Sequence, residues 1–265
     1  TAPAHFALFA PALADGRIAP AVLDSAVARV LRLKFELGLF ESGAVEPAAA
    51  LGEGPCRLTN PLDSQDTRLT RGALQALGAR ITPTNGDLEV MGTGGALQPH
   101  ADPIDLANSG TSMRLLMAVC ALGQGTYVLT GSERMQTRPV QALMDSLGQL
   151  GVPCRALGRP GCPPVAVTAG GLLGGPVRID CRQSSQYLSA LLLAAPLTSR
   201  GLDIAVEGGP VSRPYIDLTL DVMARFGVRC DREGYTAFRV PGGQRDFANP
   251  AGGPQATSSR SIALH

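Results

Sequence analysis

Several residue types and patterns that mark common classes of protein are missing from this sequence. It has no tryptophan, only three histidines, and six cysteines, none of which forms a Cys-x-x-Cys pair. A zinc site needs clustered ligands at set spacings, so we expect no metal site. The formal net charge of +1 gives no sign of a nucleic-acid partner. The longest apolar run, residues 188–197, is too short for a membrane-spanning helix, which needs about 20 residues.

The remaining composition is that of a globular protein built from many short elements. Of 265 residues, 45% are hydrophobic and 17% are charged, which is enough for a sizeable core. The 32 glycines and 21 prolines favour many turns. The cysteines show no disulfide pattern and the N-terminus shows no basic leader, so we expect a cytoplasmic chain without a signal peptide. Cys120 lies in an apolar run and is expected to be buried.

Three segments of the chain repeat one pattern of an amphipathic helix, a glycine turn, a strand and a Gly-Gly pair. The helical parts cover residues 67–81, 137–154 and 212–230, and the strand parts cover 87–95, 163–171 and 236–243. The turn glycines are Gly78, Gly151 and Gly227, spaced by 73 and 76 residues. Glycine just past a helix is a common C-cap. The repeat therefore predicts an α/β fold of similar units.

A small polar pair opens an apolar segment at the same phase of each repeat. The pairs are Gly110-Thr111, Ser184-Ser185 and Ser258-Ser259. The first two segments are apolar almost all round, which predicts buried helices, and we read residues 258–265 as the start of a third. Two interpretations of these helix starts stay open. In one, the small polar residues are N-caps that satisfy free N–H groups of the helix. In the other, the dipoles of the helices converge on an anion-binding site.

Three further stretches place polar side chains at or before helix starts. The stretch 131–140 carries Arg134 and Arg138, and guanidinium groups grip carboxylate or phosphate bidentately. The stretches 182–193 and 208–223 carry the polar residues Ser184, Ser185, Gln186, Ser212, Arg213 and Tyr215. Surface arginines and ordinary helix caps are the alternative interpretation of all three.

Five motifs, in this order and spacing, resemble the 5-enolpyruvylshikimate-3-phosphate synthases. They read "LTNPLDSQDTRLTRGALQALGA", "NSGTSMR", "ERMQTRPV", "SSQYLSALLLAAPL" and "VSRPYIDLTLDVM", and the resemblance covers roughly residues 47–248. It implies repeated βαβαββ units in two lobes, with one lobe largely present here. It also implies enolpyruvyl transfer from phosphoenolpyruvate to the 5-hydroxyl of shikimate 3-phosphate, in aromatic amino acid biosynthesis, without metal or organic cofactor. The UDP-N-acetylglucosamine enolpyruvyl transferases share the fold, but Ser-Ser-Gln and Ser-Arg-Pro-Tyr favour the shikimate enzymes.

The resemblance also implies a binding role for particular residues of this chain. Shikimate 3-phosphate would be held by Ser184, Ser185, Gln186, Ser212 and Tyr215. Phosphoenolpyruvate would be held by Gly110, Arg138 and Gln186, with Asn108, Thr111 and Arg114 shaping that helix start. Both ligands are anionic, and hydroxyls, arginines and helix N-termini are suitable receptors for anions.

The chain departs from this family at both ends. The family's opening Gly-Ser-Lys-Ser-x-Ser-x-Arg motif is replaced by "LGLFESGAV" at residues 37–45. Residues 16–41 predict a helix and resemble a tail segment of family 3 glycoside hydrolases. Residues 252–265 resemble the crossing into the second lobe, which we expect to be absent together with its catalytic acid and base groups. Leu115 also stands where many members have proline, beside the phosphoenolpyruvate pocket.

These departures predict three regions: a foreign helical segment and linker over 1–45, an enolpyruvyl transferase-like lobe over 46–248, and a truncated crossover over 249–265. We expect this chain to bind shikimate 3-phosphate weakly, to bind phosphoenolpyruvate little, and to turn over poorly or not at all. Its partners would be these small anions and a complementary lobe, with no nucleic acid and no membrane. The other hypotheses are a non-catalytic binding or scaffold fragment, a UDP-N-acetylglucosamine enolpyruvyl transferase-like protein and a glycosidase fragment.

Overall fold

The computed structural model describes residues 42–244 and 260–263, together with the isolated residues 15, 17, 19 and 22. Residues 42–244 and 260–263 belong to one compact unit. Almost all of the helix expected over residues 16–41 lies outside the described residues.

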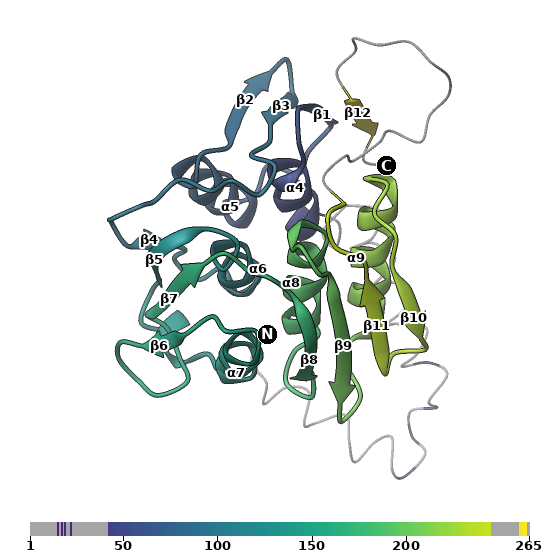
Figure 1. Ribbon diagram of the computed structural model, residues 1–265. Coiled ribbons are helices and arrows are strands. Elements are labelled where there is room, and N and C mark those ends of the chain that lie inside the picture. The colour runs from purple at the N-terminus through teal and green to yellow at the C-terminus, as the bar shows by residue number, and fades with distance from the viewer. Residues whose placement is uncertain are drawn as a thin grey trace. The chain divides into compact units, whose positions relative to one another are not determined.

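The described elements alternate between helices and short strands (Figure 1). The helices are α4 (Ser42–Leu51), α5 (Gln65–Ala76), α6 (Gly110–Cys120), α7 (Gln141–Gln149), α8 (Gln186–Ala194) and α9 (Arg213–Arg225), with 3-10 turns η1 (Met135–Thr137) and η2 (Ala195–Leu197). The strands are β1 (Pro55–Thr59), β2 (Arg80–Thr84), β3 (Asp87–Met91), β4 (Ile104–Asp105), β5 (Gln124–Thr130), β6 (Cys154–Ala156), β7 (Val165–Gly170), β8 (Gly175–Asp180), β9 (Leu202–Glu207), β10 (Asp231–Glu233), β11 (Ala237–Val240) and β12 (Arg260–Ala263).

The strands form three four-stranded sheets with the same internal order. The orders are β12-β1-β3-β2, β4-β5-β7-β6 and β8-β9-β11-β10. In each sheet the first pair is parallel and the other two pairs are antiparallel. The α/β repeat expected from the glycine spacing is therefore confirmed. Gly78, Gly151 and Gly227 each have a positive φ at the end of a helix, as a glycine C-cap requires.

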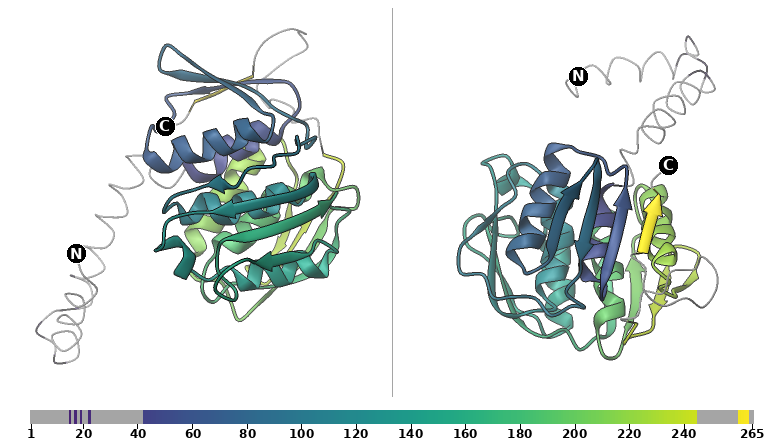
Figure 2. Two further views of the ribbon diagram at one scale, coloured as in Figure 1. Left: turned by 90° about the vertical axis from the view of Figure 1, so that its left-hand side faces the viewer. Right: turned by 90° about the horizontal axis from the view of Figure 1, so that it is seen from above.

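The helices lie between the sheets, as the turned views in Figure 2 show. α6 and α8 pack against each other, and all residues of α8 from Tyr187 to Ala194 are buried. Cys120 at the end of α6 is fully buried, as predicted for a small apolar side chain. α4 packs against α5, α6, α8 and α9, whereas α5, α7 and α9 each keep an exposed face. Apolar burial of this kind is the main source of stability for such a layered fold.

Hydroxyl pairs join neighbouring helices inside this apolar layer. The Thr70 hydroxyl on α5 lies 2.6 Å from that of Ser112 on α6, and the Ser189 hydroxyl on α8 lies 2.8 Å from that of Thr219 on α9. All four side chains are buried. Each pair satisfies two polar groups that would otherwise destabilise the core, so the pairs fix how the helices align.

The expected third apolar helix over residues 258–265 is wrong. Arg260–Ala263 forms β12, which pairs in parallel with β1, with Leu58 opposite Ile262. Figure 2 shows β12 beside β1 at the edge of the sheet. In the other two sheets this position is filled by β4 and β8, so β12 completes the first repeat from the far end of the chain. The sequence could not predict this strand for two reasons. In so short an apolar segment the spacing of hydrophobic residues does not distinguish a strand from a helix. The strand with which it pairs also lies about 200 residues away along the chain.

Candidate functional site

The start of α6 is a capped helix end. Ser109 precedes α6, and its hydroxyl accepts a hydrogen bond from the N–H of Ser112 at 3.5 Å. The two hydroxyls also lie 2.7 Å apart, and Ser112 continues the contact to Thr70 on α5. The capping interpretation therefore applies to Ser109. Gly110 and Thr111, which follow it, line an open hollow instead.

The starts of α8 and α9 are built differently. Ser185 and Ser212 are their N-cap residues, and neither side chain makes a capping hydrogen bond. Ser184 accepts the N–H of Gln186 at 3.2 Å. The N–H of Val211 donates to the carbonyl of Cys181 at 3.3 Å, which brings the two loops side by side. Serine hydroxyls and two helix N-termini therefore gather in one place, an arrangement suited to an anion.

A hollow of about 360 Å³ lies where α5, α6 and α8 begin. Its lining includes six of the residues predicted for the site: Asn108, Gly110, Thr111, Arg114, Arg138 and Gln186. Gln65 and Asp66, at the start of α5, complete it and were missed. Both follow the N-cap Ser64 inside the first family-like motif, so the rule applied to the other helix starts would have found them.

Two guanidinium groups meet over Gly110. A Cβ at residue 110 would lie 2.6 Å from Arg138 Nη1 and 3.0 Å from Arg114 Nη1. Arg138 Nη1 donates to the carbonyl of Asn108 at 3.5 Å, and Arg114 Nη1 donates to the carbonyl of Gly110 at 3.3 Å. Within the described ranges neither arginine pairs with a carboxylate, and the buried Nε of Arg114 has no partner. Two like charges held together in this way attract an anion.

The first residues of α8 hold these arginines in place. Gln186 accepts a hydrogen bond from Arg114 Nη1 at 2.7 Å and donates one to the Thr111 hydroxyl at 2.7 Å. The Arg114 guanidinium lies 5.4 Å from the centroid of the Tyr187 ring. The Tyr187 hydroxyl donates to the carbonyl of Pro139 at 2.7 Å, next to Arg138, and burial raises the pKa of that hydroxyl.

The remaining predicted residues do not line the hollow. Ser184, Ser185, Ser212 and Tyr215 lie at the adjoining starts of α8 and α9, so the predicted site divides into two neighbouring parts that share Gln186. Tyr215 is 37% exposed, and partial burial raises its pKa. Arg134, four residues before Arg138, is exposed and directly precedes η1, outside the hollow.

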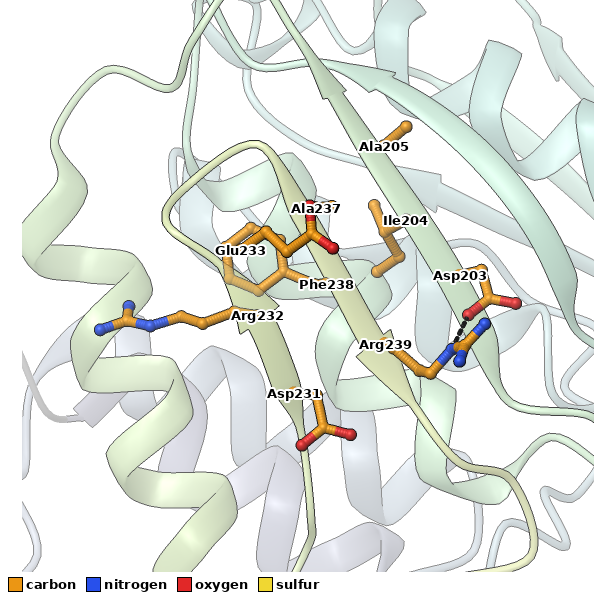
Figure 3. A pocket seen from close by; sticks show the side chains of 9 residues that line it. All are labelled: Asp203, Ile204, Ala205, Asp231, Arg232, Glu233, Ala237, Phe238 and Arg239. Carbon is orange, nitrogen blue, oxygen red and sulfur yellow. Dashed lines mark hydrogen bonds and ion pairs between the residues drawn. The ribbon is translucent and has the colours of Figure 1, made fainter.

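A larger hollow of about 500 Å³ lies elsewhere, along β9, β10 and β11 (Figure 3). Both of its arginines already pair with carboxylates: Arg239 Nε lies 2.6 Å from Asp203 Oδ1, and Arg232 Nη1 lies 2.6 Å from Asp217 Oδ1 on α9. Figure 3 shows Arg232 extending away from Arg239. None of the predicted site residues line this hollow, and its ion pairs leave neither arginine unmatched for an anionic ligand. The smaller hollow is therefore the better candidate.

Gln186→Glu tests whether the two arginines form an anion site. The carboxylate would pair with Arg114, so we expect the affinity for inorganic phosphate to fall about tenfold while the fold is kept. Phosphorus NMR titration measures this affinity. Gln124→Glu, at an exposed position that begins β5, adds the same charge as the matched control. An equal loss in both variants would show a general charge effect and no specific site.

The described part of the chain contains no group of three or more His, Cys, Asp or Glu side chains that could hold a metal ion. None of its helices is long and apolar enough to cross a membrane.

Comparison with known proteins decides the family. The model of the family described as "EPSP synthase (3-phosphoshikimate 1-carboxyvinyltransferase)" matches residues 48–252. The chain belongs to the EPSP synthase family. A 3-phosphoshikimate 1-carboxyvinyltransferase of Sulfurovum sp. is 46% identical over 200 residues, which are 74% of this chain and 47% of that protein. One from Shewanella piezotolerans has the same identity and coverage.

Solved structures agree with this assignment. EPSP synthase from Acinetobacter baumannii has a TM-score of 0.69 and 26% identity, over 85% of this chain and 47% of that one. The enolpyruvyl transferase NikO from Streptomyces tendae has a TM-score of 0.55 and 20% identity, over 86% of this chain and 49% of that one, and so shows the shared fold alone. This EPSP synthase family chain spans about half the length of the curated relatives it matches.

Proposed function

We propose that this chain provides the shikimate 3-phosphate-binding part of an enolpyruvyl transferase of aromatic amino acid biosynthesis. The observation that carries the proposal is the adjoining pair of helix starts at α8 and α9, where Ser185 and Ser212 make no capping hydrogen bond of their own. Gln186 joins these starts to the pair of arginines over Gly110. Family membership supports the choice of ligand, since curated relatives carry the name 3-phosphoshikimate 1-carboxyvinyltransferase. We also propose a cytoplasmic location.

Each part of the site would take one anion. Ser184, Ser185, Ser212 and Tyr215 would hold the phosphate and hydroxyls of shikimate 3-phosphate, because hydroxyls and helix N–H groups donate to phosphate oxygens. Arg138 and the N-terminus of α6 would hold phosphoenolpyruvate. Gln186 begins α8 and lines the hollow, so it would touch both ligands. Arg114, Thr111 and Asn108 would keep the start of α6 in shape.

Binding and turnover make different demands on this site. Protonation of the enolpyruvyl group and removal of the hydroxyl proton need an acid and a base within hydrogen-bond reach. Among the described residues, the hollow is lined by a single carboxylate, Asp66, and by no lysine. We therefore expect the 265-residue chain to bind the first ligand and to form product poorly or not at all, and addition of a complementary lobe to restore turnover.

Calorimetric titration of the folded chain with shikimate 3-phosphate tests the proposal, with shikimate as the matched control. We expect saturable binding that requires the phosphate. Absence of heat from protein shown by circular dichroism to be folded would contradict the proposal and favour a scaffold role. Product formed by the purified chain alone, in the presence of phosphoenolpyruvate, would contradict the expectation of binding without turnover.

A further inference from the structure

The start of α9 is held in a backbone conformation that its own sequence does not favour. Ser212 has φ 52° and ψ 54°, in the left-handed region that residues with a Cβ rarely adopt. Its side chain makes no capping hydrogen bond that would offset this strain. Strained backbone persists only where surrounding contacts determine it, so the contacts around this turn must hold it in place.

Tyr235 supplies such contacts from the turn between β10 and β11. Its hydroxyl donates to Asp217 Oδ2 at 2.6 Å, and its ring centroid lies 5.1 Å from the guanidinium carbon of Arg213. Arg213 and Asp217 are four residues apart, so they lie on one face of the first turns of α9. A single aromatic side chain therefore spans the segment that directly follows Ser212.

Arg232 on β10 strengthens the same contact. Its guanidinium carbon also lies 5.1 Å from the Tyr235 centroid, and its Nη1 lies 2.6 Å from Asp217 Oδ1. Partial burial would raise the pKa of Asp217, but the hydrogen bonds from Tyr235 and Arg232 hold it below its usual value. The carboxylate therefore stays charged at neutral pH, with one donor on each oxygen.

Arg213 depends on this ring for its position. Across residues 42–244 it makes no ion pair or hydrogen bond that competes with the ring contact. A guanidinium over an aromatic face is attracted by the ring quadrupole, so the ring sets the direction of the Arg213 side chain and of the turn that carries it. The neighbouring residues Ser212 and Tyr215 are two of those expected to meet the phosphorylated ligand.

We propose that Tyr235 is a positioning residue for the anion-binding segment Ser212–Tyr215, clamping the start of α9 through Arg213 and Asp217. The ligand assignment rests on the proposed function, but the clamp itself does not. Tyr235 touches no ligand in this arrangement. Its role is to keep the Ser212 turn in the conformation that presents the N-terminus of α9.

Two substitutions at Tyr235 separate its ring from its hydroxyl. Tyr235→Leu removes both, and we expect the affinity for shikimate 3-phosphate to fall about tenfold. Tyr235→Phe keeps the ring under both guanidinium groups, so we expect partial rescue, with a loss of about threefold. Arg239→Gln on β11 is the matched control, because it breaks an exposed ion pair with Asp203 on β9 and leaves Tyr235, Arg213, Asp217 and Arg232 in place (Figure 3).

The second readout needs no ligand. The Cα and Cβ chemical shifts of Ser212 report its left-handed backbone, and we expect Tyr235→Leu to move them while Arg239→Gln does not. If the unsubstituted chain fails to bind shikimate 3-phosphate, the proposed function fails, and these shifts alone decide the clamp. Unchanged Ser212 shifts in Tyr235→Leu would overturn the proposed role of Tyr235. If the parent chain binds shikimate 3-phosphate, unchanged affinity in Tyr235→Leu would overturn it too. An equal loss of affinity in Arg239→Gln would have the same meaning.

Discussion

Arg138→Leu is expected to weaken the binding of phosphoenolpyruvate by about 10- to 100-fold without lowering the stability of the ligand-free chain. A charge-assisted hydrogen bond to an anion contributes about 1.5–3 kcal/mol, which corresponds to this range. Because phosphoenolpyruvate alone is expected to bind weakly, the measurement is phosphorus NMR titration of the chain saturated with shikimate 3-phosphate. Thermal unfolding of the ligand-free protein supplies the stability.

Weaker binding without a loss of stability is expected from the geometry at Gly110. The head groups of Arg138 and Arg114 meet there, and in the described part of the structure no carboxylate offsets either charge. Like charges in contact raise the energy of the ligand-free state, and an anion lowers it. The substitution of Arg138 therefore relieves the repulsion between the two guanidinium groups. It also removes one of the groups that would bind the anion.

Arg134→Leu is the matched control for Arg138→Leu. Arg134 lies four residues earlier, is exposed and directly precedes η1, outside the hollow. We expect it to leave both the affinity and the melting temperature unchanged. Equal loss of affinity in the two variants would mean that net charge, and no particular contact, governs binding. A marked loss of stability in Arg138→Leu alone would show a structural role instead.

Much of the fold could be predicted because it depends on local patterns. Gly78, Gly151 and Gly227 punctuate the repeats, and the apolar segments after residues 110 and 185 have no polar face to expose, so they must be buried. The parallel pairing of β12 with β1 could not be predicted in this way. Arg260–Ala263 pairs with β1 at the edge of its sheet, and no local pattern in residues 258–265 indicates that distant partner.

The candidate site was predictable in its parts but not in its assembly. The sequence predicts polar helix starts at residues 110, 184 and 212. Of the serines that stand at the observed N-caps there, Ser109 caps its own helix, whereas Ser185 and Ser212 do not. The difference arises from tertiary contacts, such as the buried hydroxyl contact from Ser112 to Thr70. The bond between Arg114 and Gln186 joins residues 72 positions apart, so it appears only once the helices are packed.

Glu46 is expected to make this protein less stable as the pH rises from about 4.5 to about 7. Its side chain is 2% exposed on α4, and its Oε2 has no hydrogen-bond partner among the described residues. Burial raises the pKa of this carboxyl from 4.5 to about 7, although the Arg71 guanidinium on α5 lowers it in part. An uncharged carboxyl can stay in the core, but the ionised form pays a large desolvation penalty.

The direction of the effect follows from proton binding. The folded pKa lies above the unfolded value, so between pH 4.5 and 7 the folded state binds the extra proton. The contribution of Glu46 is therefore complete below pH 4.5 and is lost as the pH rises to about 7. At about 1.4 kcal/mol for each pKa unit, the total loss is roughly 3 kcal/mol.

Urea unfolding of the parent chain and Glu46→Gln at pH 5 and pH 8 measures this loss. The amide keeps the shape of the side chain and cannot ionise, so the variant should be more stable than the parent by roughly 3 kcal/mol at pH 8 and by much less at pH 5. Glu89→Gln, at an exposed position on β3, is the matched control and should track the parent at both pH values. The prediction is contradicted if the free energy of unfolding of Glu46→Gln equals that of the parent at both pH values, as expected for Glu89→Gln. In that case ionisation of the buried Glu46 carboxyl does not cause the fall in stability with pH.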